Sequence, residues 1–277
     1  KHHESAVANQ TKIVNCCGFD SIPSDMGVYF IQKISKVKKG QIAKQIQMRV
    51  AGASGGISGG TYESLSHVNE EAHKDKNIFK VLINPYGLNP VGEQEGLDKY
   101  DLRTIVYDKA SKSWIGPFVM AAINTKIVRR SNAYGKDFRY DEATLSGKGL
   151  KGRVKGFISV IPIGLMMSAK PGSLLKRIID KILPKAGEGP NKKQRENGFY
   201  NLRFYITYED GSKALAKVIG DMDPGYGSTS KMLSEAAICL AKDELSYLGG
   251  VLTPSTAMGD KLLSRLEKNA GLTFSYK

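Results

Sequence analysis

The most concentrated group of reactive side chains lies near the N-terminus, where a short apolar run ends. Residues 11–17 predict a buried parallel strand, and Cys17, Gly18, Phe19 and Asp20 stand at its end. Ser21, Ser24 and Asp25 then crowd the first turn of an expected helix. Ligands of open α/β sheets bind at the carboxyl ends of parallel strands, where a helix start offers unpaired N–H groups. The pattern predicts either a ligand-binding turn or an ordinary helix cap.

A tyrosine between two glycines marks a second candidate position. The segment Asp223-Pro224-Gly225-Tyr226-Gly227 joins an expected hairpin to an expected helix. A phenol presented in this way can donate a proton to a reacting group. The alternative is a turn in which Tyr226 only packs against its neighbours.

Two glycine-rich segments raise the question of phosphate binding. Residues 52–61 precede an expected helix and predict either a backbone that approaches a ligand closely or a mobile loop. Residues 147–152 read Gly-Lys-Gly-Leu-Lys-Gly and match G-x-G-x-x-G. We expect no strand before this run, and no acid lies about 20 residues after it, so we interpret it as a basic loop rather than a dinucleotide fingerprint.

Two adjacent arginines, Arg129 and Arg130, lie in a segment over residues 121–130 that we interpret as a basic strand. Successive side chains of a strand face opposite sides, so at most one of the two lines a given pocket. That arginine could hold a carboxylate or a phosphate, and otherwise both are solvated.

Histidines and cysteines lack the spacing of metal ligands. His67 and His73 are six residues apart on an expected helix and so face different directions, and Cys16 and Cys17 are adjacent. Together with Cys239, these cysteines form no disulfide framework and are typical of a reducing compartment. We therefore predict a cytoplasmic protein with no metal site.

The charge is strongly basic and unevenly distributed. Its net value of +14 indicates an anionic partner. Between Glu142 and Asp180 there are seven Lys/Arg and no acid, together with the apolar run 157–167 and an amphipathic helix over 173–183. Basic and apolar residues in one segment favour an anionic membrane, a lipid-droplet surface or an acidic carrier protein, and the alternative is a core hairpin with solvated lysines. Nucleic acid is disfavoured because aromatic and basic residues do not interleave, and the uncharged stretches are too short to span a membrane.

The expected elements place these residues in a layered fold. Strands are predicted over 11–17, 41–50, 121–130 and 154–163, and a hairpin over 199–208 and 213–221. Helices are predicted from Ile22 to Ile34 and over 61–75, 173–183, 228–242 and 253–269. We expect an α/β plus α+β protein, in which the termini form a remnant of a Rossmann-type parallel sheet and the middle forms a mixed or antiparallel sheet covered by helices.

The 277 residues divide into three expected parts. Residues 1–40 would be the last strand–helix unit of a Rossmann-like domain, and 41–222 an α+β substrate and dimerisation lobe. Residues 223–277 would be C-terminal helices that return to the first unit. The chain starts at Lys1 without an initiator Met, so we expect a fragment of a longer protein.

Several segments carry a family resemblance. The run from Asn15 to Gly27, NCCGFDSIPSDMG, resembles the signature of the saccharopine dehydrogenase-like oxidoreductases. This family includes the bacterial trans-acting enoyl reductases and the animal saccharopine dehydrogenase-like protein. Further matching segments follow in order over almost the whole chain: 58–61, 117–124, 128–133, 187–190, 223–227 and 252–259.

The resemblance implies a site as well as a fold. It implies an N-terminal dinucleotide-binding domain, which this chain lacks, and hydride transfer from NADP or NAD. Cys17, Gly18, Phe19 and Asp20 would lie beside the nicotinamide, Tyr226 would donate the proton, and Ser24 or Arg130 would orient the substrate.

The resemblance also implies a substrate, which would be a hydrophobic enoyl thioester of lipid or polyketide type. An acidic carrier protein would present it, and the reductase would be a homodimer. One alternative is a non-catalytic relative at a lipid droplet or membrane. The other is a saccharopine-type imine reductase, which would need more convergent arginines than Arg129 and Arg130.

Overall fold

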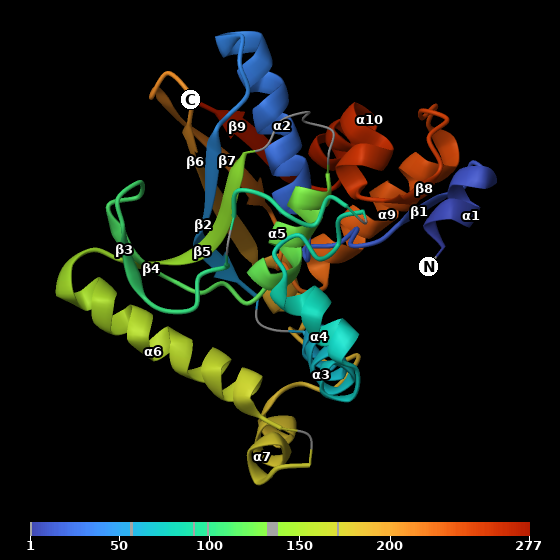
Figure 1. Ribbon diagram of the computed structural model, residues 1–277. Helices are drawn as coiled ribbons and strands as arrows, with labels where there is room; N and C mark the ends of the chain where they lie inside the picture. Colours follow the sequence, from blue (N-terminus) through green and yellow to red (C-terminus); the bar gives the residue numbers. More distant parts are fainter. Residues whose placement is uncertain (1, 56–57, 91, 99, 132–137, 171) are drawn as a thin grey trace.

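Two β-sheets organise the described part of the chain (Figure 1). A computed structural model describes residues 2–55, 58–90, 92–98, 100–131, 138–170 and 172–277. The strands are β1 (Lys12–Val14), β2 (Gln45–Ser54), β3 (Val106–Asp108), β4 (Ser113–Gly116), β5 (Arg139–Gly147), β6 (Phe199–Thr207), β7 (Lys213–Gly220), β8 (Gly250–Leu252) and β9 (Leu272–Tyr276). The helices are α1 (His3–Ala8), α2 (Ile22–Lys39), α3 (Gly59–Lys74), α4 (Lys76–Ile83), α5 (Ala121–Arg130), α6 (Gly149–Ser168), α7 (Leu174–Ile182), α8 (Lys192–Glu196), α9 (Gly227–Lys242) and α10 (Pro254–Asn269).

The larger sheet has seven strands in the order β3-β4-β5-β2-β6-β7-β9. β2 and β5 are parallel, and the other neighbours are antiparallel. Alternation along β2 and β6 directs one set of apolar side chains to a buried face. Helix α2 lies directly on this face: a Cβ at Gly27 would be 2.8 Å from the Phe204 ring. The core therefore lies between this sheet and the layer of α2, α9 and α10.

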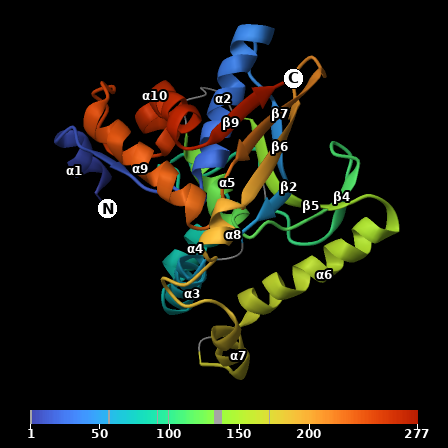
Figure 2. The same cartoon turned by 180° about the vertical axis from the view of Figure 1, so that it is seen from behind.

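The smaller sheet joins the two ends of the chain. β1 and β8 pair in parallel, with Ile13 opposite Val251. α1 and α10 contact this pair, and α10 also packs on α2 (Figure 2). The expected fold class is confirmed, since a two-stranded parallel sheet accompanies a mixed sheet covered by helices. The three-part division stays a prediction, and β9 of the last part pairs with β7 of the middle part.

The prediction of a strand over 121–130 was wrong, because these residues form α5. The β-branched residues of this segment suggested a strand. In the structure, Ala121, Thr125 and Val128 lie on one buried helical face, and the Thr125 hydroxyl donates to the Ala121 carbonyl at 2.8 Å. Tertiary burial therefore overrides the β propensity of the segment. Arg129 and Arg130 are consequently neighbours on a helix rather than alternating residues of a strand.

The prediction of a strand over 154–163 was also wrong. This segment lies in α6, which contains Pro162 in its interior. Gly152 and Gly156 stand four residues apart and let the helix backbone approach β4 and β5 closely. A Cβ at Gly152 would lie 2.2 Å from the Gly147 carbonyl oxygen, and one at Gly156 would lie 3.1 Å from Ile105. Among the helices of the described residues, none combines the length and apolar character that a bilayer span requires.

The interpretation of residues 147–152 as a basic loop needs correction too. β5 precedes this run and α6 begins within it, so the order is strand, turn, helix. The glycines serve close packing of α6 against the backbone at Gly147. Parts of two other predicted segments, residues 56–57 and 132–133, lie outside the described residues.

Candidate active site

The Cys17–Asp20 turn lies against the start of α9. The Phe19 N–H donates to Thr229 Oγ1 at 3.0 Å, and the Thr229 hydroxyl donates to the Pro224 carbonyl at 2.8 Å. A Cβ at Gly18 would lie 2.9 Å from Thr229 Cγ2, so glycine is required for this contact. The structure therefore brings together two of the segments singled out in the sequence, the end of β1 and the turn that contains Tyr226.

The Cys17 thiol of this turn and the adjacent Cys16 thiol are held in the neutral form. Burial raises the pKa of Cys16 to about 11 and that of Cys17 to about 12. Burial also raises the pKa of Asp20. A thiol with a raised pKa is a poor nucleophile, so the turn offers main-chain groups and shape rather than thiolate chemistry.

Tyr226 is a half-buried residue between three loops. Its hydroxyl donates to the Glu188 carbonyl at 3.2 Å, and the Gly59 N–H donates to the same oxygen at 2.9 Å. A Cβ at Gly189 would lie 2.7 Å from the tyrosine ring. Asp223, which is fully buried, accepts the Tyr226 N–H at 2.9 Å. The phenol is thus packed and oriented, with its proton directed to a carbonyl.

Ser24 points into the protein rather than toward a surface. It is 1% exposed and hydrogen-bonds to Glu142, a buried residue of β5. Glu142 also accepts from the Tyr140 hydroxyl at 2.7 Å and from Asn124 Nδ2 at 3.0 Å. Burial raises the pKa of Glu142 to about 7. Ser24 therefore belongs to a buried polar cluster beneath the start of α2.

Asp25 forms a second buried cluster that joins two helix starts. Its carboxylate accepts the Ser255 N–H at 2.8 Å, the Ser255 hydroxyl at 2.9 Å and the Ser131 hydroxyl at 2.5 Å. Burial raises the pKa of Asp25 to about 6. The helices that follow β1 and β8 are therefore connected at the carboxyl edge of the small sheet.

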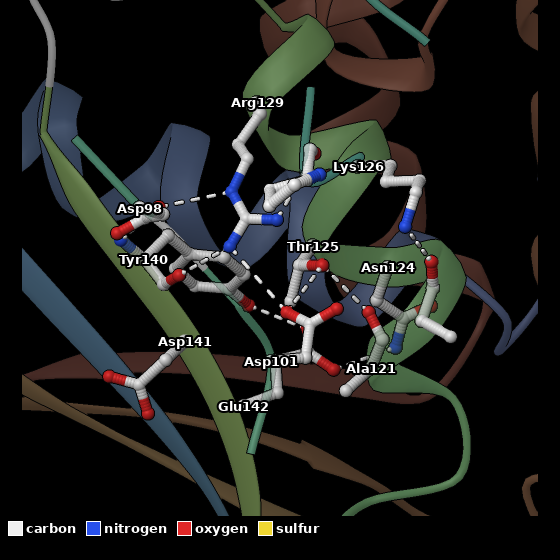
Figure 3. Close-up of polar contacts among 12 residues, drawn as sticks. Asp98, Asp101, Ala121, Asn124, Thr125, Lys126, Arg129, Tyr140, Asp141 and Glu142 are labelled. Carbon is white, nitrogen blue, oxygen red and sulfur yellow. Dashed lines mark hydrogen bonds and ion pairs between the residues drawn. The ribbon is translucent and has the colours of Figure 1, made fainter. Parts of the chain in front are cut away.

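Arg129 is occupied by internal partners (Figure 3). Its Nε donates to Asp98 at 3.0 Å, and its Nη2 donates to the Tyr140 carbonyl at 3.0 Å and lies 3.6 Å from Asp101. The neighbouring Lys126 is 4% exposed, donates to the Ala122 carbonyl at 3.0 Å, and has its pKa lowered by burial. Arg129 therefore stabilises the packing of α5 on β5, and its guanidinium is directed into the protein.

Arg130 lies beside a cavity of about 600 Å³. Its Nη2 donates to the Val251 carbonyl of β8 at 3.0 Å, and its Nη1 donates to the Leu88 carbonyl. Burial lowers the pKa of this guanidinium. The cavity is also lined by the first turns of α10, including Thr253, Thr256 and Lys261. It thus stands where β8 ends, the side on which sheets of this kind bind ligands.

The predicted site residues occupy different environments. The Cys17–Asp20 turn adjoins the turn of Tyr226, whereas Ser24 contacts Glu142 and Arg130 reaches the carbonyls beside the cavity. Sequence reasoning did not assign roles to Asp25, Glu142, Asp223 or Thr229. Asp25 was visible as one of the polar residues of the crowded turn, but the strand that carries Glu142 was not anticipated.

Comparison with known proteins identifies the family. No protein-family model matches the chain. A protein of Mycobacterium tuberculosis is 36% identical over 96% of the chain, which covers 67% of that protein. The trans-acting enoyl reductases of Mycobacterium ulcerans and Mycobacterium leprae are 34% and 32% identical, also with 96% of the chain and 67% of the relative covered. The chain therefore belongs to the family of the trans-acting enoyl reductases.

Proposed function

We propose that the protein reduces the carbon–carbon double bond of an enoyl thioester with a nicotinamide cofactor. The names of the relatives support an enoyl-reducing oxidoreductase. The observation that carries the proposal is the carboxyl edge of the β1–β8 pair. There the starts of α2 and α10 are joined by Asp25, and a cavity of about 600 Å³ adjoins them.

The residues present fit the nicotinamide end of a dinucleotide better than its phosphates. The Cys17–Asp20 main chain follows a parallel strand and precedes a helix, as such a site requires. The Gly147–Gly152 run does not offer a phosphate cradle, because Gly152 is closed against the Gly147 backbone. Among the described strands, β1 pairs with β8 alone, and the Ile13 side chain of β1 is 37% exposed. In this proposal, further residues of the protein pair with the open edge of β1.

The chain's own groups would bind and protonate the substrate. When bound, the cofactor supplies a hydride for the β-carbon of the enoyl group. We assign to Tyr226 the transfer of its hydroxyl proton to the α-carbon and to Arg130 the orientation of the thioester carbonyl, where the developing enolate charge requires donors. The buried hydrogen bond of Ser24 to Glu142 supports a role in positioning the start of α2 rather than in contacting substrate.

The acyl group would be of lipid or polyketide type, and the net charge of +14 would attract an acidic carrier. The imine-reductase alternative receives less support, because recognition of a dicarboxylate substrate needs several convergent guanidinium groups. Arg129 is held inside the protein by Asp98 and the Tyr140 carbonyl, so of the two adjacent arginines Arg130 alone lines the cavity.

The experiment follows oxidation of NADPH and of NADH by the purified protein in the presence of an enoyl thioester. We expect turnover, and a loss of kcat on the order of 100-fold or more in Tyr226→Phe with unchanged cofactor affinity. Tyr247→Phe, at a residue that is 90% exposed, is the control. If the protein shows no turnover and binds neither cofactor, the proposal is overturned. Full activity of Tyr226→Phe would remove only the role assigned to Tyr226.

A further inference from the structure

An unpartnered apolar stripe runs along α6. The opposite face of this helix packs on β4 and β5 through Gly152, Gly156 and Val160. The stripe recurs at spacings of three and four residues, and its side chains are between 47% and 75% exposed: Leu150, Val154, Phe157, Ile158, Ile161 and Leu165. Such a stripe is normally the buried side of a helix. Here the fold turns the stripe away from the sheet, and none of the described residues covers it.

Helix α7 also has one side packed on the protein and an apolar side exposed to solvent. Asp180 accepts from the Tyr62 hydroxyl of α3, and Lys176 Nζ lies within hydrogen-bond distance of both side chains. These contacts fix the polar side of α7 against α3. The side chains on its other side point to solvent, with Leu174 74%, Ile178 47% and Ile182 75% exposed. Both helices lie at the end of the molecule away from the small sheet (Figures 1 and 2).

Basic residues border the apolar surface. On α6, Lys151 and Arg153 stand on either side of the stripe, and the Arg153 guanidinium lies 5.3 Å from the Trp114 ring centroid and 6.0 Å from that of Phe157. Between Glu142 and Asp180 the sequence contains seven Lys/Arg residues and no Asp or Glu. An apolar face with basic borders, on a helix without the apolar length that a bilayer span requires, is the pattern of an interfacial helix.

We propose that α6 and α7 form a docking surface for an anionic lipid bilayer, with the α6 stripe seated at the boundary of headgroups and acyl chains. Charge favours lipid over a second copy of this chain, because a two-fold interface would place these basic residues against one another. An acidic protein would complement the charge but would have to cover a stripe of about 23 Å on a convex helix. A bilayer surface accepts such a stripe without a matching groove. This inference is independent of the reductase proposal.

The test measures co-sedimentation of the full chain with vesicles of phosphatidylcholine, with and without phosphatidylserine. We expect binding that depends on phosphatidylserine, weakens with salt, and falls at least about 10-fold in Phe157→Glu/Ile161→Glu. The matched control is Leu233→Glu/Ile238→Glu, which places the same charges at exposed apolar residues of α9. Thermal melting verifies that each variant is folded.

A second measurement locates the contact. Trp114 is the single tryptophan of the chain and lies beside Arg153, so bromine-labelled acyl chains should quench its fluorescence in the wild type and not in the stripe variant. Absence of binding to anionic vesicles overturns the proposal, as does equal binding by the stripe variant. It also fails if the stripe variant converts a dimer to a monomer, or loses an acidic carrier protein, while vesicle binding is unchanged.

Discussion

Asp25 and Ser255 are 230 residues apart in the chain, yet the carboxylate of the first accepts both the N–H and the hydroxyl of the second. Asp25 lies in the first turn of α2, and Ser255 lies in the first turn of α10. Because these helices follow β1 and β8, the contact joins the two strand ends at the carboxyl edge of the small sheet. A carboxylate buried here also makes stability depend on pH.

The pH dependence is the first prediction. Burial raises the pKa of Asp25 from 3.8 to about 6, so the folded state holds this proton more tightly than the unfolded state. The free energy of unfolding should therefore fall as pH rises from about 4 to about 7. Asp25→Asn keeps the shape and should reduce this fall, as measured by chemical denaturation across that range. Asp260→Asn at an exposed ion pair is the control, and equal slopes in wild type and Asp25→Asn would contradict the prediction.

The second prediction concerns Arg49, which is 1% exposed and paired with Asp108 and Asp141 beside a cavity of about 560 Å³. Arg49→Met should lower the free energy of unfolding by about 3–5 kcal/mol, because Asp108 would remain buried without its counter-charge. Adding Asp108→Asn should recover part of this loss. Lys33→Met, which breaks the exposed pair with Asp260, should cost no more than about 1 kcal/mol. If Arg49→Met and Lys33→Met lower the free energy of unfolding by similar amounts, burial of the ion pair does not determine how much Arg49 contributes to stability.

The third prediction compares two glycines of α6. A Cβ at Gly152 would lie 2.2 Å from the Gly147 carbonyl oxygen, whereas a Cβ at Gly164 would meet nothing within 4 Å. Gly152→Ala should therefore destabilise the protein, and Gly164→Ala should stabilise it by up to about 1 kcal/mol, since alanine favours a helix interior. The measurement is the denaturant midpoint of each variant, compared with that of the wild type. Equal shifts of the same sign would mean that α6 does not pack on β4 and β5 as described.

The fourth prediction tests the contact between the two predicted site segments. Thr229→Val removes the acceptor of the Phe19 N–H and the donor to the Pro224 carbonyl, and should cost about 1–3 kcal/mol of stability. Thr229→Ser retains the hydroxyl and should retain most of the stability. If the turn of Tyr226 serves the reaction, Thr229→Val should also lower kcat at a temperature where the variant is folded. Equal stability of the valine and serine variants would show that the hydrogen bonds of the Thr229 hydroxyl do not stabilise the contact.

Strong local signals made several elements predictable. The hairpin of β6 and β7 was confirmed, with Gly211 at a φ of 78° in its turn, and so were α2, α7, α9 and α10. In these segments hydrophobic periodicity and the flanking cap or turn residues agree. The cysteine–aspartate turn after β1 was likewise visible, because a polar cluster followed a short apolar strand.

The helices α5 and α6 were not predictable from the same signals. Both are rich in β-branched residues, and α6 contains Pro162, so local preference pointed to strands. Burial of Val128 against the core and the close approach allowed by Gly152 and Gly156 outweigh that preference. No element was predicted over residues 139–147, so β5 and the position of Glu142 were not anticipated either.

The sequence by itself determined the mixed fold class, the elements with consistent periodicity, and the basic, apolar character of residues 148–182. Only the tertiary structure decided which polar groups are buried together and which apolar faces stay exposed. Asp25 meets Ser255, and Ser24 meets Glu142, across elements distant in the chain, while the α6 stripe finds no cover among the described residues. The physical reason is that desolvation and pairing depend on the neighbours that the fold supplies, which spacing along one segment does not encode.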